Sequence, residues 1–239
     1  MQRLWLWMIV GLVAAGCAPA PPPGIPPRPA VNEPPGFPSQ RYEAGYAEGG
    51  QVYRVVPRES GVRIRVYPAG PLADERGHKH VAASRKVQGY VFVADEAEGS
   101  RADLFLPVHS LQVDRPEDLS AIGWHSELTP AQKRATRRNM LGPVLKAGTY
   151  PFVEISVRAR KADLPAATLE SRITLRGVEQ ALRSKAAVQL DRDRLRAVGA
   201  FRLQQTAFGI EPFSAMGGLL TVRDTIEVSY RVVAAPLSD

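Results

Sequence analysis

Histidine is the side chain in this sequence best suited to metal chemistry, and two of the four histidines lie close together. His78 and His80 are separated by one residue in the segment GHKH. On an extended strand, residues i and i+2 share a face, so both imidazoles could ligate a divalent metal ion. A metal site needs further ligands, and His109 and His125 are the only other histidines. The alternative is a turn whose histidines hydrogen-bond to the backbone or cap a barrel.

The sequence carries no other pattern that predicts catalysis. It has no readable Ser-His-Asp or Cys-His arrangement, no P-loop, no GxGxxG and no HExxH. Asp114, Glu117 and Asp118 form an acidic cluster around Pro116, a composition that predicts a solvent-exposed loop. We therefore expect a protein that is not an enzyme and that has no resident cofactor.

Cys17 is the only cysteine, and its surroundings suggest why. It follows a short basic start, an uncharged apolar run at 4–15 and small residues at 14–16. A spanning helix needs roughly 20 apolar residues, whereas this layout is typical of an export signal. It resembles the bacterial lipoprotein signal, in which cleavage precedes a cysteine whose sulfur carries a diacylglycerol. We expect a lipoprotein signal peptide at 1–16 and lipidation, including palmitate-type chains, at Cys17. The alternative is an ordinary signal with an incidental cysteine.

Proline dominates the segment that follows the cysteine. Cys17–Pro38 contains ten of the chain's 21 prolines. Proline lacks an N–H and fixes φ, so such a tract stays extended at about 3.1 Å per residue. We expect a disordered tether over 17–50 that holds the folded part away from a membrane. In bacterial lipoproteins, Asp directly after the lipidated cysteine favours retention in the inner membrane. Ala18 occupies that position here, so by this resemblance we expect the protein on the periplasmic side of the outer membrane of the cell envelope.

Residues 51–235 are long enough for one domain, because about 185 residues can enclose a sizeable core. The net charge of the full chain is +7. The basic residues are scattered among acidic ones without an aromatic-interleaved stripe, so we expect no nucleic-acid partner.

The apolar residues of this domain recur mostly with a period of two. In RLRAVGAFRLQ, for example, Ala197, Gly199 and Phe201 fall on one face, and Arg196 and Arg202 fall on the other. This alternation predicts antiparallel strands with one face buried, arranged as a sandwich or barrel. We expect strands at 51–57, 61–66, 85–94, 101–113, 152–160, 167–176, 178–190, 194–204 and 225–233.

One segment predicts a helix instead. Thr129 can cap it, Pro130 occupies the first helical position and Gln132 the third, which together form a capping box. Pro143 should kink or split the helix. The basic residues at 133–138 could face anionic lipid headgroups or simply lie in solvent.

Several segments, taken in order, resemble the YceI-like domain family. They are VYRVVPRESGVRIRV (52–66), TYPFVEISV (149–157), LESRITLRGVEQAL (169–182), AFGI (207–210) and DTIEVSYRVV (224–233). The resemblance covers 51–235 and implies an antiparallel, lipocalin-like β-barrel with one inserted helix. Two motifs depart from the family pattern: Val56–Ser60 replaces Asp-Pro-x-His-Ser, and Gln205–Gly209 replaces Arg-x-Asp-Phe-Gly.

The resemblance also implies that the barrel binds a long isoprenoid chain. The apolar residues that alternate inward are the candidates to line such a cavity; a core packed solid by side chains is the alternative. The candidates are Val62, Ile64, Val66, Val153, Ile155, Val157, Ala197, Gly199, Phe201, Ile226, Val228 and Tyr230. The expected function is a membrane-anchored lipoprotein that binds a lipophilic, isoprenoid-like molecule. The alternative is a metal-binding or stress-related envelope protein that uses His78 and His80.

Overall fold

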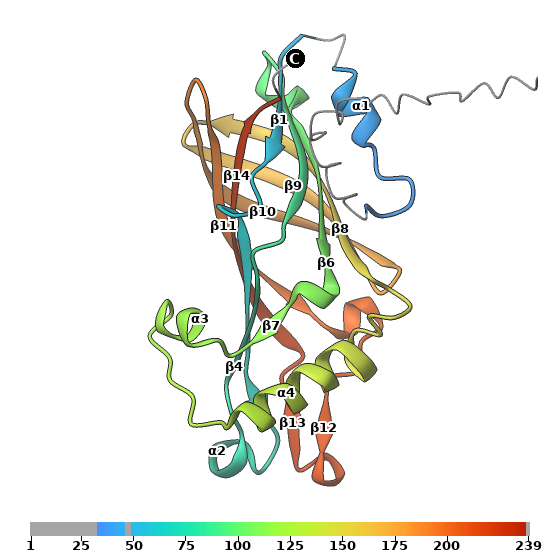
Figure 1. Cartoon of the computed structure of the whole chain (residues 1–239), viewed down its shortest axis with the longest axis vertical. Coiled ribbons are helices and arrows are strands. Elements are labelled where there is room, and N and C mark those ends of the chain that lie inside the picture. The colour runs from blue at the N-terminus through green and yellow to red at the C-terminus, as the bar shows by residue number, and fades with distance from the viewer. Residues whose placement is uncertain (1–32, 46–48, 238–239) are drawn as a thin grey trace, which may run out of the picture. The chain divides into compact units, whose positions relative to one another are not determined.

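The alternating segments form the strands of a closed antiparallel β-barrel (Figure 1). The computed structural model describes residues 33–45 and 49–237. The predicted fold class, a mainly β, lipocalin-like barrel with an inserted helix, is confirmed. The predicted signal peptide, Cys17 and most of the proline-rich segment lie outside the described residues.

The elements are as follows. The strands are β1 (Gln51–Val55), β2 (Gly61–Val66), β3 (Pro68–Ala69), β4 (His80–Ser84), β5 (Gln88–Val93), β6 (Arg101–Pro107), β7 (Gln112–Val113), β8 (Phe152–Asp163), β9 (Ala166–Leu175), β10 (Val178–Leu190), β11 (Leu195–Gln204), β12 (Ser214–Ala215), β13 (Leu220–Val222) and β14 (Thr225–Pro236). The α-helices are α1 (Ser39–Glu43), α2 (Ala73–Arg76), α3 (Pro116–Ser120) and α4 (Pro130–Asn139). The other helical turns are η1 (Ala97–Gly99), η2 (Val108–Ser110), η3 (Met140–Val144), η4 (Thr206–Phe208) and η5 (Met216–Gly218).

The barrel has eight strand positions, and at three of them the strand is interrupted and consists of two consecutive segments. Its order is β1, β5, β6, β8, β9, β10, β11 and β14, with β14 pairing back onto β1. Beyond a break, β2 continues β1, β4 continues β5 and β7 continues β6, because β2 pairs with β4, and β4 with β7. The predicted strands 85–94 and 101–113 are therefore shorter in the structure.

Strand β4 is absent from the sequence-based prediction, and its burial explains why. Val81, Ala82, Ala83 and Ser84 are all at most 5% exposed. Both faces of β4 are covered, one by the barrel interior and the other in part by α3. A strand that is buried on both faces lacks the alternation on which the prediction depended.

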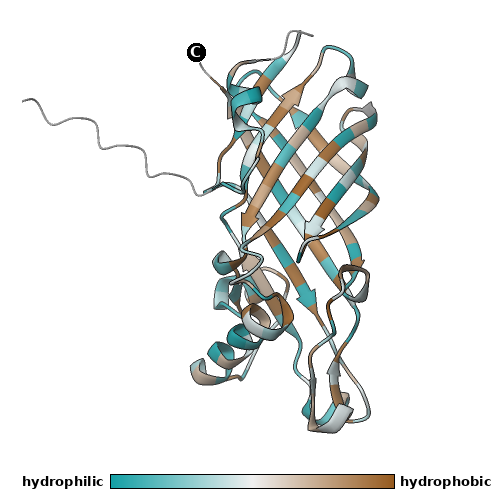
Figure 2. Ribbon diagram, turned by 90° about the vertical axis from the view of Figure 1, so that its right-hand side faces the viewer, coloured by the Kyte–Doolittle hydropathy of each residue, from teal (hydrophilic) through white to brown (hydrophobic). Residues whose placement is uncertain are grey.

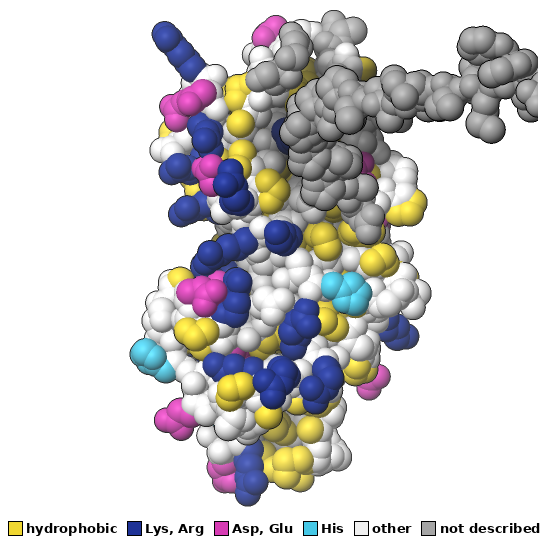
Figure 3. All heavy atoms as spheres, viewed as in Figure 1, with side chains coloured by type: hydrophobic (Ala, Val, Ile, Leu, Met, Phe, Trp, Pro, Cys, Tyr) yellow, Lys and Arg dark blue, Asp and Glu magenta, His cyan; other side chains and the backbone are white. Residues whose placement is uncertain are grey.

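Elsewhere the alternation sets which side chains point inward. Figure 2 shows hydrophobic and hydrophilic residues alternating along the long strands. On β11, Ala197 and Phe201 line the interior, whereas Val198 and Arg202 lie outside. Lys and Arg side chains are spread over the outer surface among acidic and hydrophobic ones (Figure 3). The period of two thus places apolar side chains in the interior and charged side chains on the exterior.

The lower end in Figure 1 is closed by the segment α4–η3. The predicted capping box is present: Gln132 N donates to Thr129 Oγ1 at 3.3 Å, and Thr129 N donates to Gln132 Oε1 at 2.9 Å. Around Pro143 the helix widens into a π-turn, with Leu145 N bonded to Met140 O at 2.9 Å. Because proline has no N–H, the turn rearranges there instead of continuing regularly.

The apolar side of this segment enters the barrel. Met140, Leu141 and Leu145 pack against the main core cluster, and Val144 packs with Phe208. The segment is also held from outside, since Lys133 Nζ and Arg137 Nε donate to the carbonyls of residues 114 and 111. These two members of the basic stretch therefore serve as structural contacts.

Residues before 51 also pack on the barrel, which differs from the predicted tether of 17–50. Tyr42 of α1 is fully buried, stacks on Tyr90 with ring centroids 5.2 Å apart, and donates to Asp103 at 2.8 Å. Phe37 packs edge-on against Phe105. These two aromatic side chains cover the outer face of β5 and β6, so the compact unit begins at residue 33.

The part of the chain that the structure describes contains no helix long and apolar enough to cross a bilayer. A second, small sheet of β12, β13 and β3 extends the β14–β2 pair beyond the lower end (Figure 1).

Candidate functional site

The barrel encloses a cavity of about 500 Å³. Strands from around the barrel contribute side chains to its wall, and Met140, Val144 and Leu145 contribute from the helical segment below. The wall consists mostly of Val, Leu, Ile and Ala. The predicted alternative of a solidly packed core is therefore wrong, because the interior retains space of the size of a small-molecule site.

Eleven of the twelve predicted cavity residues line this space, and Gly199 is the exception. They are Val62, Ile64 and Val66 of β2; Val153, Ile155 and Val157 of β8; Ala197 and Phe201 of β11; and Ile226, Val228 and Tyr230 of β14. The tertiary structure brings these four strands to one interior. Contact with a ligand remains a prediction for each of them.

Gly199 is covered by an aromatic ring. It pairs across the strands with Tyr230, and a Cβ at this position would lie 2.6 Å from Cζ of the tyrosine. Glycine in a strand interior is unfavourable by itself and often marks a close approach. Here the missing side chain lets the Tyr230 ring lie directly against β11.

The cavity reaches solvent at the upper end, where β8 turns into β9 and β10 into β11. Leu164 and Leu190 line the cavity, yet they are 53% and 39% exposed. At the lower end, by contrast, the apolar residues Phe208 and Ile210 are both 2% exposed, and Gln204 at the end of β11 is the exposed lining residue there. We therefore place the mouth of the cavity at the upper rim, beside the two leucines.

Several lining residues escaped the sequence-based prediction. Leu164 and Leu190 lie at hairpin tips, where no alternation is visible, and Phe208 and Ile210 lie in an irregular connection. Val144 and Leu145 did carry a signal in the sequence, because the helical pattern allows both to face a core.

Few polar groups face the cavity. Asp95 and Arg101 are charged and lie beside the upper loops, and the uncharged polar side chains are Ser100, Ser171, Ser184, Gln204, Gln205 and Tyr230. Burial raises the pKa of Tyr230, so its phenol stays protonated at neutral pH. The middle of the cavity is therefore uncharged.

One histidine of the predicted pair, His80, has a carboxylate partner. His80 Nδ1 lies 2.7 Å from Asp114 Oδ2, and Asp114 Oδ1 accepts the Val81 backbone N–H at 2.8 Å. His78 lies in the turn before β4. Among residues 33–45 and 49–237, no three His, Cys, Asp or Glu side chains are grouped so that they could hold a metal ion. The metal hypothesis for His78 and His80 gains no support.

The acidic cluster is not the exposed loop that its composition predicts. Asp114 and Asp118 are only 1% and 2% exposed. Asp118 accepts a bond from Arg115 Nε at 2.6 Å and lies in α3. Asp114 ties the loop to β4, whereas Asp118 is paired locally with Arg115, and these partners explain why both carboxylates can be buried.

An eight-stranded barrel with an apolar interior of this size belongs to the barrels that can hold one small lipophilic ligand. Sequence comparison finds no matching family model and no matching curated protein.

Solved structures with similar folds do exist. BcnA of Burkholderia cenocepacia has a TM-score of 0.57 at 14% identity, with 76% of this chain and 99% of BcnA covered. A polyisoprenoid-binding domain from Saccharophagus degradans, implicated in plant cell wall breakdown, has a TM-score of 0.54 at 12% identity, with 78% and 99% covered. The YceI protein of Campylobacter jejuni scores lower, at 0.48 and 11% identity, with 66% and 85% covered. The first two likenesses show that the chain has the same barrel fold as these proteins, in agreement with the YceI-like fold that its motifs predicted.

Proposed function

We propose that this protein binds a lipophilic, isoprenoid-like molecule inside its barrel and holds it without chemical change. The observation that carries the proposal is the cavity itself, an apolar space of about 500 Å³ that reaches solvent at the rim formed by Leu164 and Leu190. Burial of apolar surface gives roughly 25 cal/mol per Å², so a hydrocarbon chain in this space would be bound favourably. The polyisoprenoid-binding domain of similar fold supports the choice of ligand class.

The absence of catalysis is part of the proposal. The described residues that line the cavity include hydroxyls but no histidine or lysine beside them to act as a base. Such a wall favours storage or transport of a lipophile over its conversion.

We further propose that the mature protein is a lipoprotein of the bacterial envelope, anchored through Cys17 on the periplasmic side of the outer membrane. The signal-like start and the proline-rich segment after the cysteine support this location. Two or more acyl chains would give stable attachment, whereas one gives only marginal binding.

Bound lipid is tested by native mass spectrometry after mild purification, followed by extraction and analysis of the released molecule. We expect one lipophilic molecule per chain. A protein that is isolated empty and binds no added farnesol would overturn the proposal.

A matched pair of substitutions on β11 tests the cavity as the site. Ala197→Phe would fill the lined space, and we expect farnesol affinity to fall at least about tenfold. Val198→Phe adds the same ring on the outer face, where Val198 is 39% exposed, and should leave affinity unchanged. Equal effects of the two variants would contradict an interior site.

The anchor is tested separately with Cys17→Ser in the producing cell. We expect loss of incorporated alkyne-palmitate and movement of the protein from the membrane fraction to the periplasmic fraction. Retention of both label and membrane association would contradict lipidation at Cys17.

A further inference from the structure

Tyr230 brings a hydroxyl group into an otherwise hydrocarbon part of the cavity wall. It lies near the middle of β14. Its inward neighbours on the same strand are Val228 and Val232, and Val62 pairs with it across β2. The ring of Phe201 lies 6.1 Å away, centroid to centroid. A polar atom in such surroundings requires an explanation.

The Tyr230 hydroxyl makes no hydrogen bond within the part of the chain that the structure describes. The hydroxyls of Tyr42, Tyr67 and Tyr90, outside the barrel interior, each donate to a carboxylate at 2.7–3.0 Å. Among the described residues the hydroxyl of Tyr53 also has no hydrogen-bond partner, but Tyr53 does not line the cavity. Tyr230 is half-buried, and its hydroxyl is open to the cavity; a hydroxyl that faces an apolar space without a protein partner carries a cost that phenylalanine would avoid. A partner that enters the cavity would remove this cost.

Gly199 leaves room for the phenol of Tyr230. The ring lies against the β11 backbone, in a place that any larger residue would occupy with its Cβ. The sequence thus combines two features that are unfavourable alone, a glycine within a strand and a phenol in an apolar wall. Together they present one hydrogen-bond donor to the cavity.

We propose that Tyr230 anchors the bound lipophile by donating a hydrogen bond to an uncharged oxygen, such as an alcohol or carbonyl oxygen. This inference rests on the proposed function and specifies which lipophiles the site prefers. An ionised group would lose several kcal/mol of hydration at this depth, because the neighbours of Tyr230 are apolar. The oxygen would lie inside the barrel, below the mouth, with hydrocarbon contacts on both sides.

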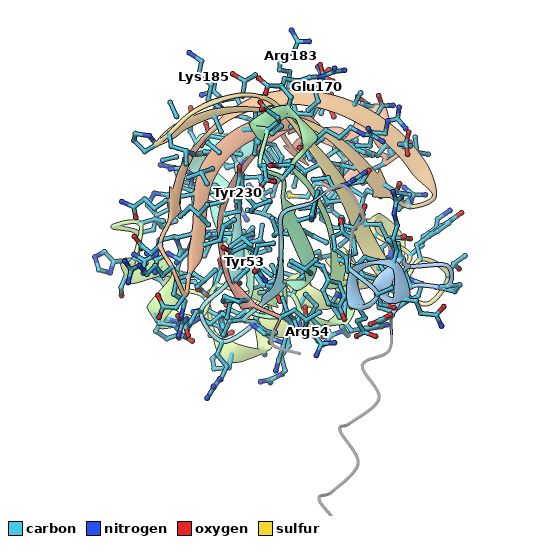
Figure 4. All side chains as sticks on the ribbon, turned by 90° about the horizontal axis from the view of Figure 1, so that it is seen from above. Tyr53, Arg54, Glu170, Arg183, Lys185 and Tyr230 are labelled. Atoms are coloured by element: carbon cyan, nitrogen blue, oxygen red, sulfur yellow. The ribbon has the colours of Figure 1, made fainter. Side chains whose placement is uncertain are left out.

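A second tyrosine supplies the control. Tyr53 is 5% exposed and packs with Leu195 and Ala234 near the upper end, but it does not line the cavity. Figure 4 shows Tyr53 and Tyr230 within the ring of strands and Arg183 pointing outward. Tyr230→Phe and Tyr53→Phe therefore remove the same atom from two interior positions, of which only the first faces the ligand.

The experiment measures dissociation constants for farnesol and for the hydrocarbon β-farnesene by displacement of N-phenyl-1-naphthylamine. We expect Tyr230→Phe to weaken farnesol binding about three- to tenfold, since a net hydrogen bond contributes about 0.5–1.5 kcal/mol. Binding of β-farnesene should stay within about twofold of the native value, and Tyr53→Phe should change neither ligand. Thermal unfolding of each variant confirms that the barrel is folded.

The outcomes separate this inference from the proposed function. If Tyr230→Phe leaves farnesol affinity unchanged, or weakens both ligands equally, the anchor is wrong while the cavity remains the site. If the native protein binds neither farnesol nor β-farnesene, the proposed function fails, and the anchor fails with it.

Discussion

The two ends of the barrel differ in how their apolar residues are packed. The lower end is packed: Phe208 and Ile210 are buried, the α4–η3 segment crosses it, and the buried carboxylate of Asp114 bonds to β4. The upper end has short hairpins, and Leu164 and Leu190 stand exposed beside the cavity. A single polypeptide thus combines a packed floor, which supplies stability, with an apolar rim, which leaves a route for a lipophile. The comparison predicts that substitutions below affect folding and substitutions above affect ligand exchange.

The largest difference in stability should come from comparing a floor residue with a rim residue. Phe208→Ala removes a ring that is 2% exposed, and we expect a loss of about 3–5 kcal/mol in the free energy of unfolding. Leu164→Ala, at 53% exposure, should cost less than about 0.5 kcal/mol. Urea unfolding followed by circular dichroism measures both values, and similar losses would abolish the distinction between the ends.

The buried carboxylate of Asp114 gives the next effect. Asp114→Ala leaves the Val81 N–H and the His80 ring without their acceptor, and we expect a loss of about 2–3 kcal/mol. Asp114→Asn retains one acceptor oxygen and should cost less. Asp95→Ala, an exposed carboxylate among the upper loops, should fall within about 0.5 kcal/mol of the native protein. A cost for Asp95→Ala as large as that of Asp114→Ala would contradict this account.

The rim should control the rate of ligand exchange. Replacing both Leu164 and Leu190 by Ser removes apolar surface at the mouth, and we expect farnesol association to slow about three- to tenfold. The free energy of unfolding should change little, because both side chains are already partly exposed, at 53% and 39%. Stopped-flow fluorescence measures the rate; an unchanged rate would place the mouth elsewhere.

The smallest effect concerns acid stability at the lower part of β14. Bonds from Tyr67 and Arg202 lower the pKa of Glu227, and Arg65 pairs with it at 2.9 Å. A lowered pKa in the folded state stabilises the protein above the ordinary glutamate pKa of about 4.3, and this stabilisation is lost as pH falls below it. Glu227→Gln should therefore cost about 1 kcal/mol or less at pH 7 and flatten the acid limb of the stability profile. An unchanged profile would show that the ion pairs contribute nothing.

Local pattern was enough for much of the barrel. The period of two fixed the inward set on β2, β8, β11 and β14, and the capping box fixed the start of α4. These features depend on neighbours a few residues apart, which a sequence displays directly. By contrast, β4 and the burial of Asp114 escaped prediction because distant segments cover them.

The sequence by itself determined that this chain alternates into a half-buried antiparallel sheet, with one face apolar, and that its start resembles a lipoprotein signal. Only the tertiary structure decided that the sheet closes around space, that its floor is plugged and its rim open, and that Tyr230 lies over Gly199. The physical reason is the distance along the chain between the residues that determine each feature. Side-chain direction follows from adjacent residues, whereas a cavity depends on which strands pair and on the volume that their side chains leave unfilled.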